Sequence, residues 1–92
     1  MRSPIEIARF KAVRKILLER WDPIGIVGIG GPHDEYDSYI WVIVRMASEG
    51  ATPDALSAHL LGIERNAMGL PGNEPRGRTA AGLVLHALRP TT

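Results

Sequence analysis

Apolar residues recur every three to four positions in four separate stretches of the chain, and this spacing predicts amphipathic helices. The stretches are residues 4–20, 35–49, 53–68 and 75–89. β-Branched residues at 24–27 and 40–44 compete as strands, but glycines interrupt the first run and helix-capping signals flank the second. We therefore predict an all-α chain, a small four-helix bundle that forms a single helical domain over residues 1–92.

Two of the predicted helices begin with strong local signals. Ser3 precedes a proline at the first helical position, and Glu6 follows three residues later, which together make a capping box. Thr52 and Pro53 repeat the combination of a cap and a proline. These signals place helix starts near residues 4 and 53.

The second helix carries a different signal, a group of carboxylates at its start. Asp34, Glu35 and Asp37 lie where the positive end of the helix dipole favours negative charge, so we expect them to act as caps. Gly50 and Gly69 are suited to end the second and third helices.

The segment between the first two helices is long and glycine-rich. Pro23 forces Asp22 out of helical geometry and so ends the first helix, and thirteen residues from 21 to 33 contain four glycines. A connection of that length leaves open whether the first two helices are neighbours. Because the loop is apolar, we expect it to pack, and one place for it is over the far side of the second helix.

Each helix has an apolar face that predicts the core. The expected core residues are Ile5, Phe10, Ala12, Val13, Ile16 and Leu17; Tyr36, Tyr39, Ile40, Ile43, Val44, Met46 and Ala47; Leu56, Leu60, Ile63 and Ala67; and Ala81, Val84, Leu85 and Leu88. Opposite the first of these faces lies a basic one, formed by Lys11, Arg14 and Lys15 with Glu19.

The composition of the chain excludes several kinds of functional site. The chain has no cysteine, which removes disulfides, cysteine-ligated zinc, iron–sulfur clusters and thiol nucleophiles. The start of the chain does not match a secretory signal, and its longest uncharged stretch, residues 23–33, is shorter than the roughly 18 to 20 apolar residues of a membrane span. We expect a cytoplasmic protein with no membrane association.

Catalytic and cofactor motifs are missing from the sequence. His33, His59 and His86 lie on separate segments without zinc-ligand spacing, and the glycines at 25–31 match neither a dinucleotide nor a Walker pattern. A cation site formed by His33 with the carboxylates at 34–37 is the weaker alternative to helix capping, because successive helical side chains diverge. We expect no enzyme, no cofactor and no metal.

Charge and one tryptophan indicate a binding surface instead. Residues 1–20 carry a net charge of +4, residues 21–54 of −5, and residues 55–92 of +2. The first two blocks either complement each other within the molecule or face a partner. Trp41 falls outside the apolar face of its helix, as an interface anchor would, unless the loop covers it. The candidate partner-binding residues are Trp41, Arg45, Asp37, Lys11, Arg14 and Lys15.

Three segments carry a resemblance to a known family. Residues 15–25 hold a W-D-P-[IL]-G block, residues 34–39 read D-E-Y-D-S-Y, and residues 60–64 read L-L-G-I-E. Together they resemble a family of short bacterial proteins of unknown function. The resemblance implies an all-helical fold and brings no activity or cofactor. The motif residues that carry it are Trp21, Asp22, Pro23, Gly25, Asp34, Tyr36 and Tyr39.

Within this block, residue chemistry predicts structural roles. Trp21 is expected to close the core at the end of the first helix, and Asp22 to accept hydrogen bonds from its own downstream backbone. Gly25 is expected to permit the turn that follows.

These observations favour a non-enzymatic protein-binding module, an immunity or antitoxin-like partner or a regulator, that binds another protein or forms a homodimer. Nucleic-acid binding through the basic face of the first helix is one alternative. A small-ligand or enzyme site under the glycine-rich loop, near Asp22, His33 and Tyr36, is the other.

Overall fold

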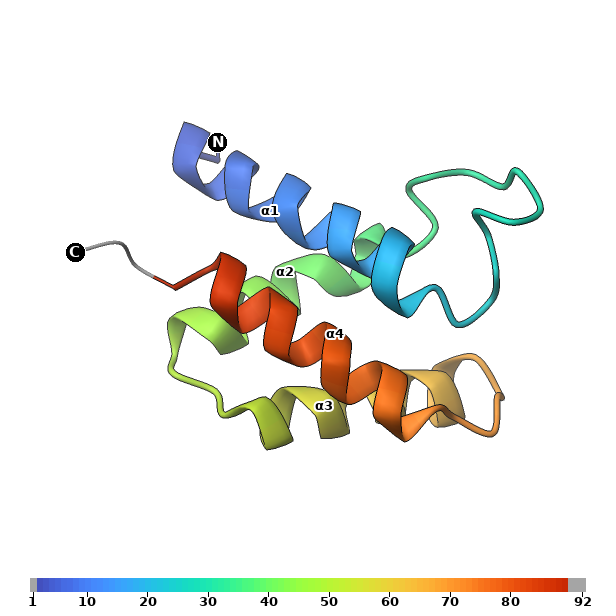
Figure 1. Cartoon of the computed structure of the whole chain (residues 1–92). Coiled ribbons are helices and arrows are strands. Elements are labelled where there is room, and N and C mark those ends of the chain that lie inside the picture. The colour runs from blue at the N-terminus through green and yellow to red at the C-terminus, as the bar shows by residue number, and fades with distance from the viewer. Residues whose placement is uncertain (1, 90–92) are drawn as a thin grey trace.

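The computed structural model describes residues 2–89, so the first residue and the last three of the predicted domain lie outside it. Its elements are, in order, α1 Pro4–Ile16, η1 Leu17–Trp21, α2 Asp37–Ser48, α3 Pro53–Gly62, η2 Ile63–Ala67 and α4 Glu74–Ala87. The elements η1 and η2 are π-helical turns that continue α1 and α3. No described residue lies in a strand, and the prediction of an all-α, four-helix chain is confirmed (Figure 1).

Three helices begin at a polar side chain that accepts a hydrogen bond from the first turn. Ser3 Oγ accepts from the backbone nitrogen of Glu6 at 3.1 Å, and Glu6 Oε1 accepts from the Ser3 nitrogen at 3.4 Å, which completes the capping box. Thr52 caps α3. Asn73 caps α4, so this helix begins at 74 instead of the predicted 75.

The start of α2 departs from the prediction. The helix begins at Asp37, two residues later than expected, and Tyr36 occupies the cap position without a capping hydrogen bond from its side chain. Asp34 and Glu35 are exposed before the helix. The Asp37 carboxylate binds Arg14 of α1. Asp37 lies in the first turn, where negative charge was expected, but its carboxylate pairs with the guanidinium of a neighbouring helix, and Asp34 and Glu35 do not cap α2.

The helices α1 and α3 end in π-helical turns that the sequence pattern did not reveal. The backbone nitrogen of Asp22 donates to Leu17 O at 2.7 Å, and that of Met68 donates to Ile63 O at 3.1 Å, each reaching five residues back. Gly50 and Gly69, expected at helix ends, have φ of +84° and +67°, the left-handed conformation in which glycine carries no Cβ penalty.

One cluster of buried side chains draws on all four helices, both π-helical turns and the loop. It consists of Val13, Leu17, Leu18, Trp21, Ile26, Tyr36, Ile40, Ile43, Val44, Leu56, Leu60, Ile63, Ala80, Ala81, Val84 and Leu88. Several other predicted core residues are partly buried, and six of them pack against this cluster: Phe10, Ile16, Tyr39, Met46, Ala47 and Leu85. Two predicted core residues are exposed instead. Ile5, in the first turn of α1, is 73% exposed, and Ala67 is exposed because the wider turn of η2 shifts the register of the helix.

The helices α1 and α2 are neighbours that run in opposite directions. Arg9 of α1 contacts Ser48, Phe10 contacts Trp41, and Arg14 contacts Asp37, so positions rise along one helix as they fall along the other. The glycine-rich loop therefore returns the chain alongside α1 (Figure 1). This arrangement decides the question that the loop length left open.

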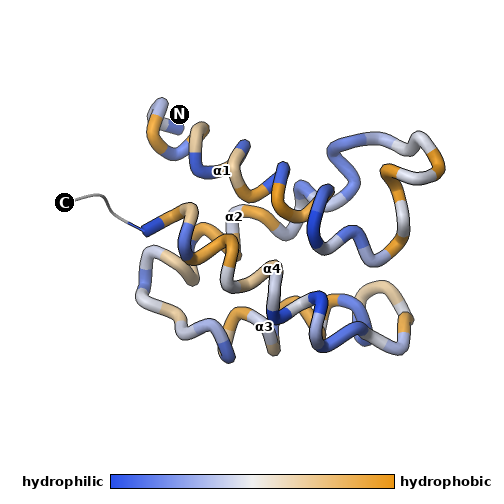
Figure 2. The backbone as a smooth tube through the Cα atoms, in the orientation of Figure 1, coloured by the Kyte–Doolittle hydropathy of each residue, from blue (hydrophilic) through white to orange (hydrophobic). Residues whose placement is uncertain are grey.

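The loop projects from one end of the bundle and is only partly packed (Figure 1). Ile26 is buried in the core, whereas Ile24, Val27 and Ile29 are 43%, 51% and 76% exposed. Figure 2 shows these hydrophobic stretches along the projecting loop. Within residues 2–89, no helix combines the length and the apolar character that crossing a membrane requires.

Candidate functional site

The W-D-P-I-G block forms a hydrogen-bonded clamp at the start of the loop. Asp22 has a φ of +29°, and its Oδ1 and Oδ2 accept from the backbone nitrogens of Ile26 at 2.8 Å and Val27 at 3.2 Å. The Tyr36 hydroxyl donates to Asp22 Oδ1 at 2.6 Å and accepts from the Ile24 nitrogen at 3.2 Å. Asp22 thus bonds its own downstream backbone, as expected.

The clamp fixes the charge state of both side chains. Partial burial alone raises the pKa of Asp22, but hydrogen bonds from Tyr36 and the loop amides outweigh it and leave the pKa below its usual value. Burial, and then the bond to Asp22, raises the pKa of the Tyr36 phenol well above its usual value. At neutral pH the pair is therefore a carboxylate that accepts and a phenol that donates.

The remaining motif residues surround this clamp. Trp21 is buried at the end of η1 and packs against Tyr36 with ring centroids 5.3 Å apart. Gly25 has a φ of +75°, which the turn after Pro23 requires. Of the other two motif residues, Tyr39 is half-buried against the core. Asp34 is exposed.

Two residues of the expected small-ligand site under the loop bind each other. Asp22 and Tyr36 are bonded to each other and to the loop backbone, while exposed His33 lines a different surface. Among residues 2–89, no group of three histidine or acidic side chains is close enough to hold a metal ion.

Arg14 and Asp37 form an ion pair between α1 and α2. Arg14 Nε lies 3.0 Å from Asp37 Oδ1, and Arg14 Nη2 lies 2.5 Å from Oδ2, a bidentate geometry. The hydrogen bonds that Arg14 donates to the Asp37 carboxylate are the main cause that raises the pKa of Arg14. Arg14 was expected on the solvent face. At this ion pair the basic first helix and the acidic block complement each other within the molecule. Arg14 and Asp37 therefore bind each other.

Trp41 packs against α1. The alternative in which the glycine-rich loop covers this side chain was wrong. Its ring lies 4.7 Å from the ring of Phe10, and the guanidinium carbon of Arg2 lies 3.8 Å from its centroid. The indole remains half-buried. The loop lies at the end of the bundle where η1 meets the start of α2 (Figure 1).

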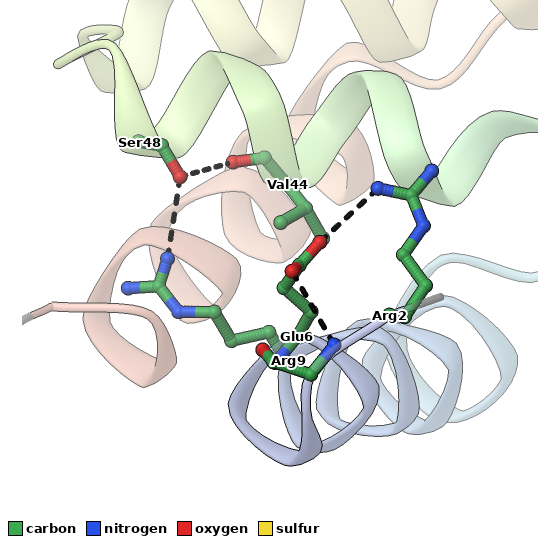
Figure 3. A network of polar contacts seen from close by, with 6 residues as sticks. Arg2, Glu6, Arg9, Val44 and Ser48 are labelled. Carbon is green, nitrogen blue, oxygen red and sulfur yellow. Dashed lines mark hydrogen bonds and ion pairs between the residues drawn. The ribbon is translucent and has the colours of Figure 1, made fainter.

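A groove of about 430 Å³ runs beside Trp41 between α1 and α2. We call it the Trp41 groove; it is lined by Arg2, Glu6, Arg9, Trp41, Val42, Val44, Arg45 and Ser48. Figure 3 shows its polar network, with Arg2, Glu6 and Arg9 lying over α2. Arg2 and Glu6 form an ion pair at 3.1 Å.

Arg9 is the anchored member of the groove. Its Nη2 donates to Leu88 O at 2.7 Å at the end of α4, and its Nη1 donates to Ser48 Oγ at 3.3 Å. Ser48 Oγ in turn donates to Val44 O at 3.0 Å. Arg45, by contrast, is exposed and takes part in no ion pair among the described residues.

Sequence analysis identified Trp41 and Arg45 but missed Arg2, Glu6 and Arg9. A signal for them was present, because residues 2, 6 and 9 have the same helical spacing as residues 41, 45 and 48. Residues 41, 45 and 48 fall on one face of α2, and residues 6 and 9 fall on one face of α1, with Arg2 just before its cap. Only the pairing of α1 with α2 shows that the two faces meet.

The candidate basic residues of α1 line a second, separate groove of about 320 Å³. Its lining is Lys11, Arg14, Lys15, Leu18, Glu19, Val27 and His33. The candidate partner-binding residues are thus divided: Trp41 and Arg45 lie in one groove, Lys11 and Lys15 in another, and Arg14 is paired with Asp37.

Comparison of the chain with family models, curated proteins and solved structures finds no match. The family resemblance of the W-D-P-I-G block therefore stays a prediction.

Proposed function

We propose that this chain is a non-enzymatic protein-binding module and that a partner docks in the Trp41 groove. An immunity or antitoxin-like role, or that of a regulator, fits a small module of this kind. The observation that carries the proposal is a half-buried tryptophan in a groove rich in arginine. Tryptophan and arginine are the residue types most enriched among the side chains that dominate binding energy at protein interfaces.

The packing of Trp41 also favours this role. Its contacts with Phe10 and Arg2 hold the indole in place before any partner arrives. A side chain that is already ordered loses little conformational entropy on binding. Val42 and Val44 supply apolar lining beside it, and Arg45 and Ser48 supply polar lining. This combination is typical of the centre and rim of an interface.

The test is capture from an extract of the host cell with a tagged protein, compared across surface variants. Arg45→Glu reverses an exposed charge in the groove that forms no ion pair with another described residue, and Arg20→Glu makes the same change outside the groove. Trp41→Ala removes the anchor, and circular dichroism confirms that each variant is folded. We expect one polypeptide to be lost with Arg45→Glu and Trp41→Ala and retained with Arg20→Glu.

Other outcomes identify other functions. A second copy of the chain as the captured protein, with dimerisation lost in the same variants, makes the groove a homodimer interface. Retention of duplex nucleic acid that disappears with Lys11→Glu and Lys15→Glu favours the basic face of α1 instead. Capture and self-association that are unchanged in both groove variants contradict the proposal.

A further inference from the structure

The Trp41 groove carries more positive charge than its own carboxylate neutralises. Three of its lining residues are the arginines Arg2, Arg9 and Arg45, and Glu6 is its one acidic residue. Glu6 is paired with Arg2 at 3.1 Å. Two guanidinium groups, those of Arg9 and Arg45, are thus left without a carboxylate partner among the described residues.

These two arginines differ in a way that suits recognition of a ligand. Arg9 is held by neutral oxygens, Leu88 O and Ser48 Oγ, so its position is set although no carboxylate within residues 2–89 pairs with it. Arg45 is exposed and stands one helical turn beyond Trp41 on α2. A fixed cation and a free one flank the same aromatic side chain.

The chemistry of the lining selects an acidic polypeptide over a nucleic acid. A carboxylate matches the planar fork of a guanidinium, and an apolar side chain beside it can pack on Trp41 and Val42. Duplex binding needs cations along an extended track, whereas α2 also carries Asp37 and Glu49. Two guanidinium groups in one short groove, with no carboxylate partner in the part of the chain that the structure describes, suit a few carboxylates.

We propose that the Trp41 groove binds an acidic segment of a partner polypeptide, in which aspartate or glutamate side chains flank an apolar residue. The inference rests on the proposed function and adds the chemistry of the partner. The carboxylates would bind Arg9 and Arg45, and the apolar residue would lie against the part of the half-buried indole that Phe10 and Arg2 leave exposed.

The test is an NMR titration of the ¹⁵N-labelled protein with two capped pentapeptides. One has four glutamates around a central leucine, and the other has four glutamines in their place. We expect the glutamate peptide to bind about tenfold more tightly, with affinity falling steeply as salt rises. The shifts should centre on the Trp41 indole and the groove residues.

Two matched variants locate the charge effect. Arg45→Gln should weaken binding of the glutamate peptide by about fivefold, and Arg20→Gln, which removes an exposed arginine outside the groove, should change it by less than about twofold. A short thymidine oligonucleotide serves as the phosphate probe. Tighter binding of that probe to the same groove overturns the choice of a polypeptide.

The failure of this inference is distinguishable from that of the proposed function. If both peptides bind alike, or if shifts centre on Lys11 and Lys15, the acidic preference is wrong. If a partner is still captured through Trp41, and its capture does not depend on salt, the proposed function remains supported. If the peptides show no acidic preference and no partner is captured through Trp41, both the acidic ligand and the docking surface are wrong.

Discussion

The hydroxyl of Tyr36 donates a hydrogen bond to Oδ1 of Asp22 across 2.6 Å, and this bond joins the two ends of the loop between α1 and α2. Asp22 is the first residue after η1, and Tyr36 is the last before α2. The fifteen residues from 22 to 36 therefore leave and re-enter the bundle at one fixed point. The pair therefore ties the start of α2 to the end of η1.

Removing the Tyr36 hydroxyl should test the strength of this clamp. Tyr36→Phe deletes the bonds to Asp22 and to the Ile24 nitrogen while the buried ring stays. We expect the free energy of unfolding to fall by about 1–2 kcal/mol, because Asp22 and the Ile24 amide lose a partner. Urea denaturation measures the change. Tyr39→Phe, which removes an identical hydroxyl from a ring outside the clamp, should change it by less than about 0.5 kcal/mol.

Stability should fall in acid through Asp22. Its pKa is lower in the folded protein than in the unfolded chain, so the unfolded state takes up the proton first as the pH drops. The contribution of the carboxylate is complete above its ordinary pKa, about 3.9, and is lost as the pH falls through the lower folded value.

Asp22→Asn isolates this effect, because asparagine tolerates the positive φ of position 22 and keeps the side-chain oxygen. Urea unfolding of both proteins from pH 7 to pH 2 should show the wild type more stable at neutral pH and the difference shrinking in acid. A difference that stays constant across this range would exclude the charge of Asp22 as its source.

Gly82→Ala should stabilise the protein. Gly82 lies inside α4, it is exposed, and a Cβ built on it meets no atom within 4 Å. We expect a gain of about 0.5–1 kcal/mol in the free energy of unfolding, since alanine loses less backbone entropy in a helix. Thermal unfolding measures the gain as a raised Tm.

Gly72→Ala is the opposing control for this substitution. Gly72 has a φ of +91°, and a Cβ there would lie 2.6 Å from Leu61 Cδ1 and 3.0 Å from Arg65 Nε. The same chemical change should therefore lower the Tm. A lower Tm for Gly82→Ala as well would mean that α4 packs more tightly at that position than these distances indicate.

Substitutions of Glu64 and Arg76, which form an ion pair, should change the free energy of unfolding in a strongly non-additive way. The Glu64 side chain is 1% exposed, and its Oε1 accepts from Arg76 Nη2 at 3.1 Å, while Glu64 Oε2 and Arg76 Nε are buried without partners. Arg76→Met strands a buried carboxylate, and we expect it to cost about 2 kcal/mol. The cost is lower than for a fully enclosed pair because the Arg76 side chain is 36% exposed.

Replacing both partners should restore stability. Glu64→Leu with Arg76→Met removes the buried charge together with its partner, so we expect the double variant to regain at least about 1 kcal/mol over Arg76→Met alone. Urea denaturation of the four proteins completes the cycle. If the double variant loses as much unfolding free energy as the two single variants together, Glu64 and Arg76 contribute to stability independently.

Local signals in the sequence determined much of the fold. The caps Ser3 and Thr52 and the terminal glycines 50 and 69 act through neighbouring residues, so the helix boundaries that they mark were predictable. The start of α2 was mispredicted because Asp37 finds its partner in α1. A choice between a local and a distant hydrogen bond is not encoded in spacing.

The candidate site was only half predictable for the same reason. The sequence alone determined four amphipathic helices, the absence of cysteine chemistry, and a tryptophan on the polar side of its helix. The tertiary structure decided that Phe10 and Arg2, instead of the loop, cover Trp41, and that Arg9 and Arg45 share its groove. Helical periodicity specifies which side chains share a face, but the partner of that face depends on how distant helices pack.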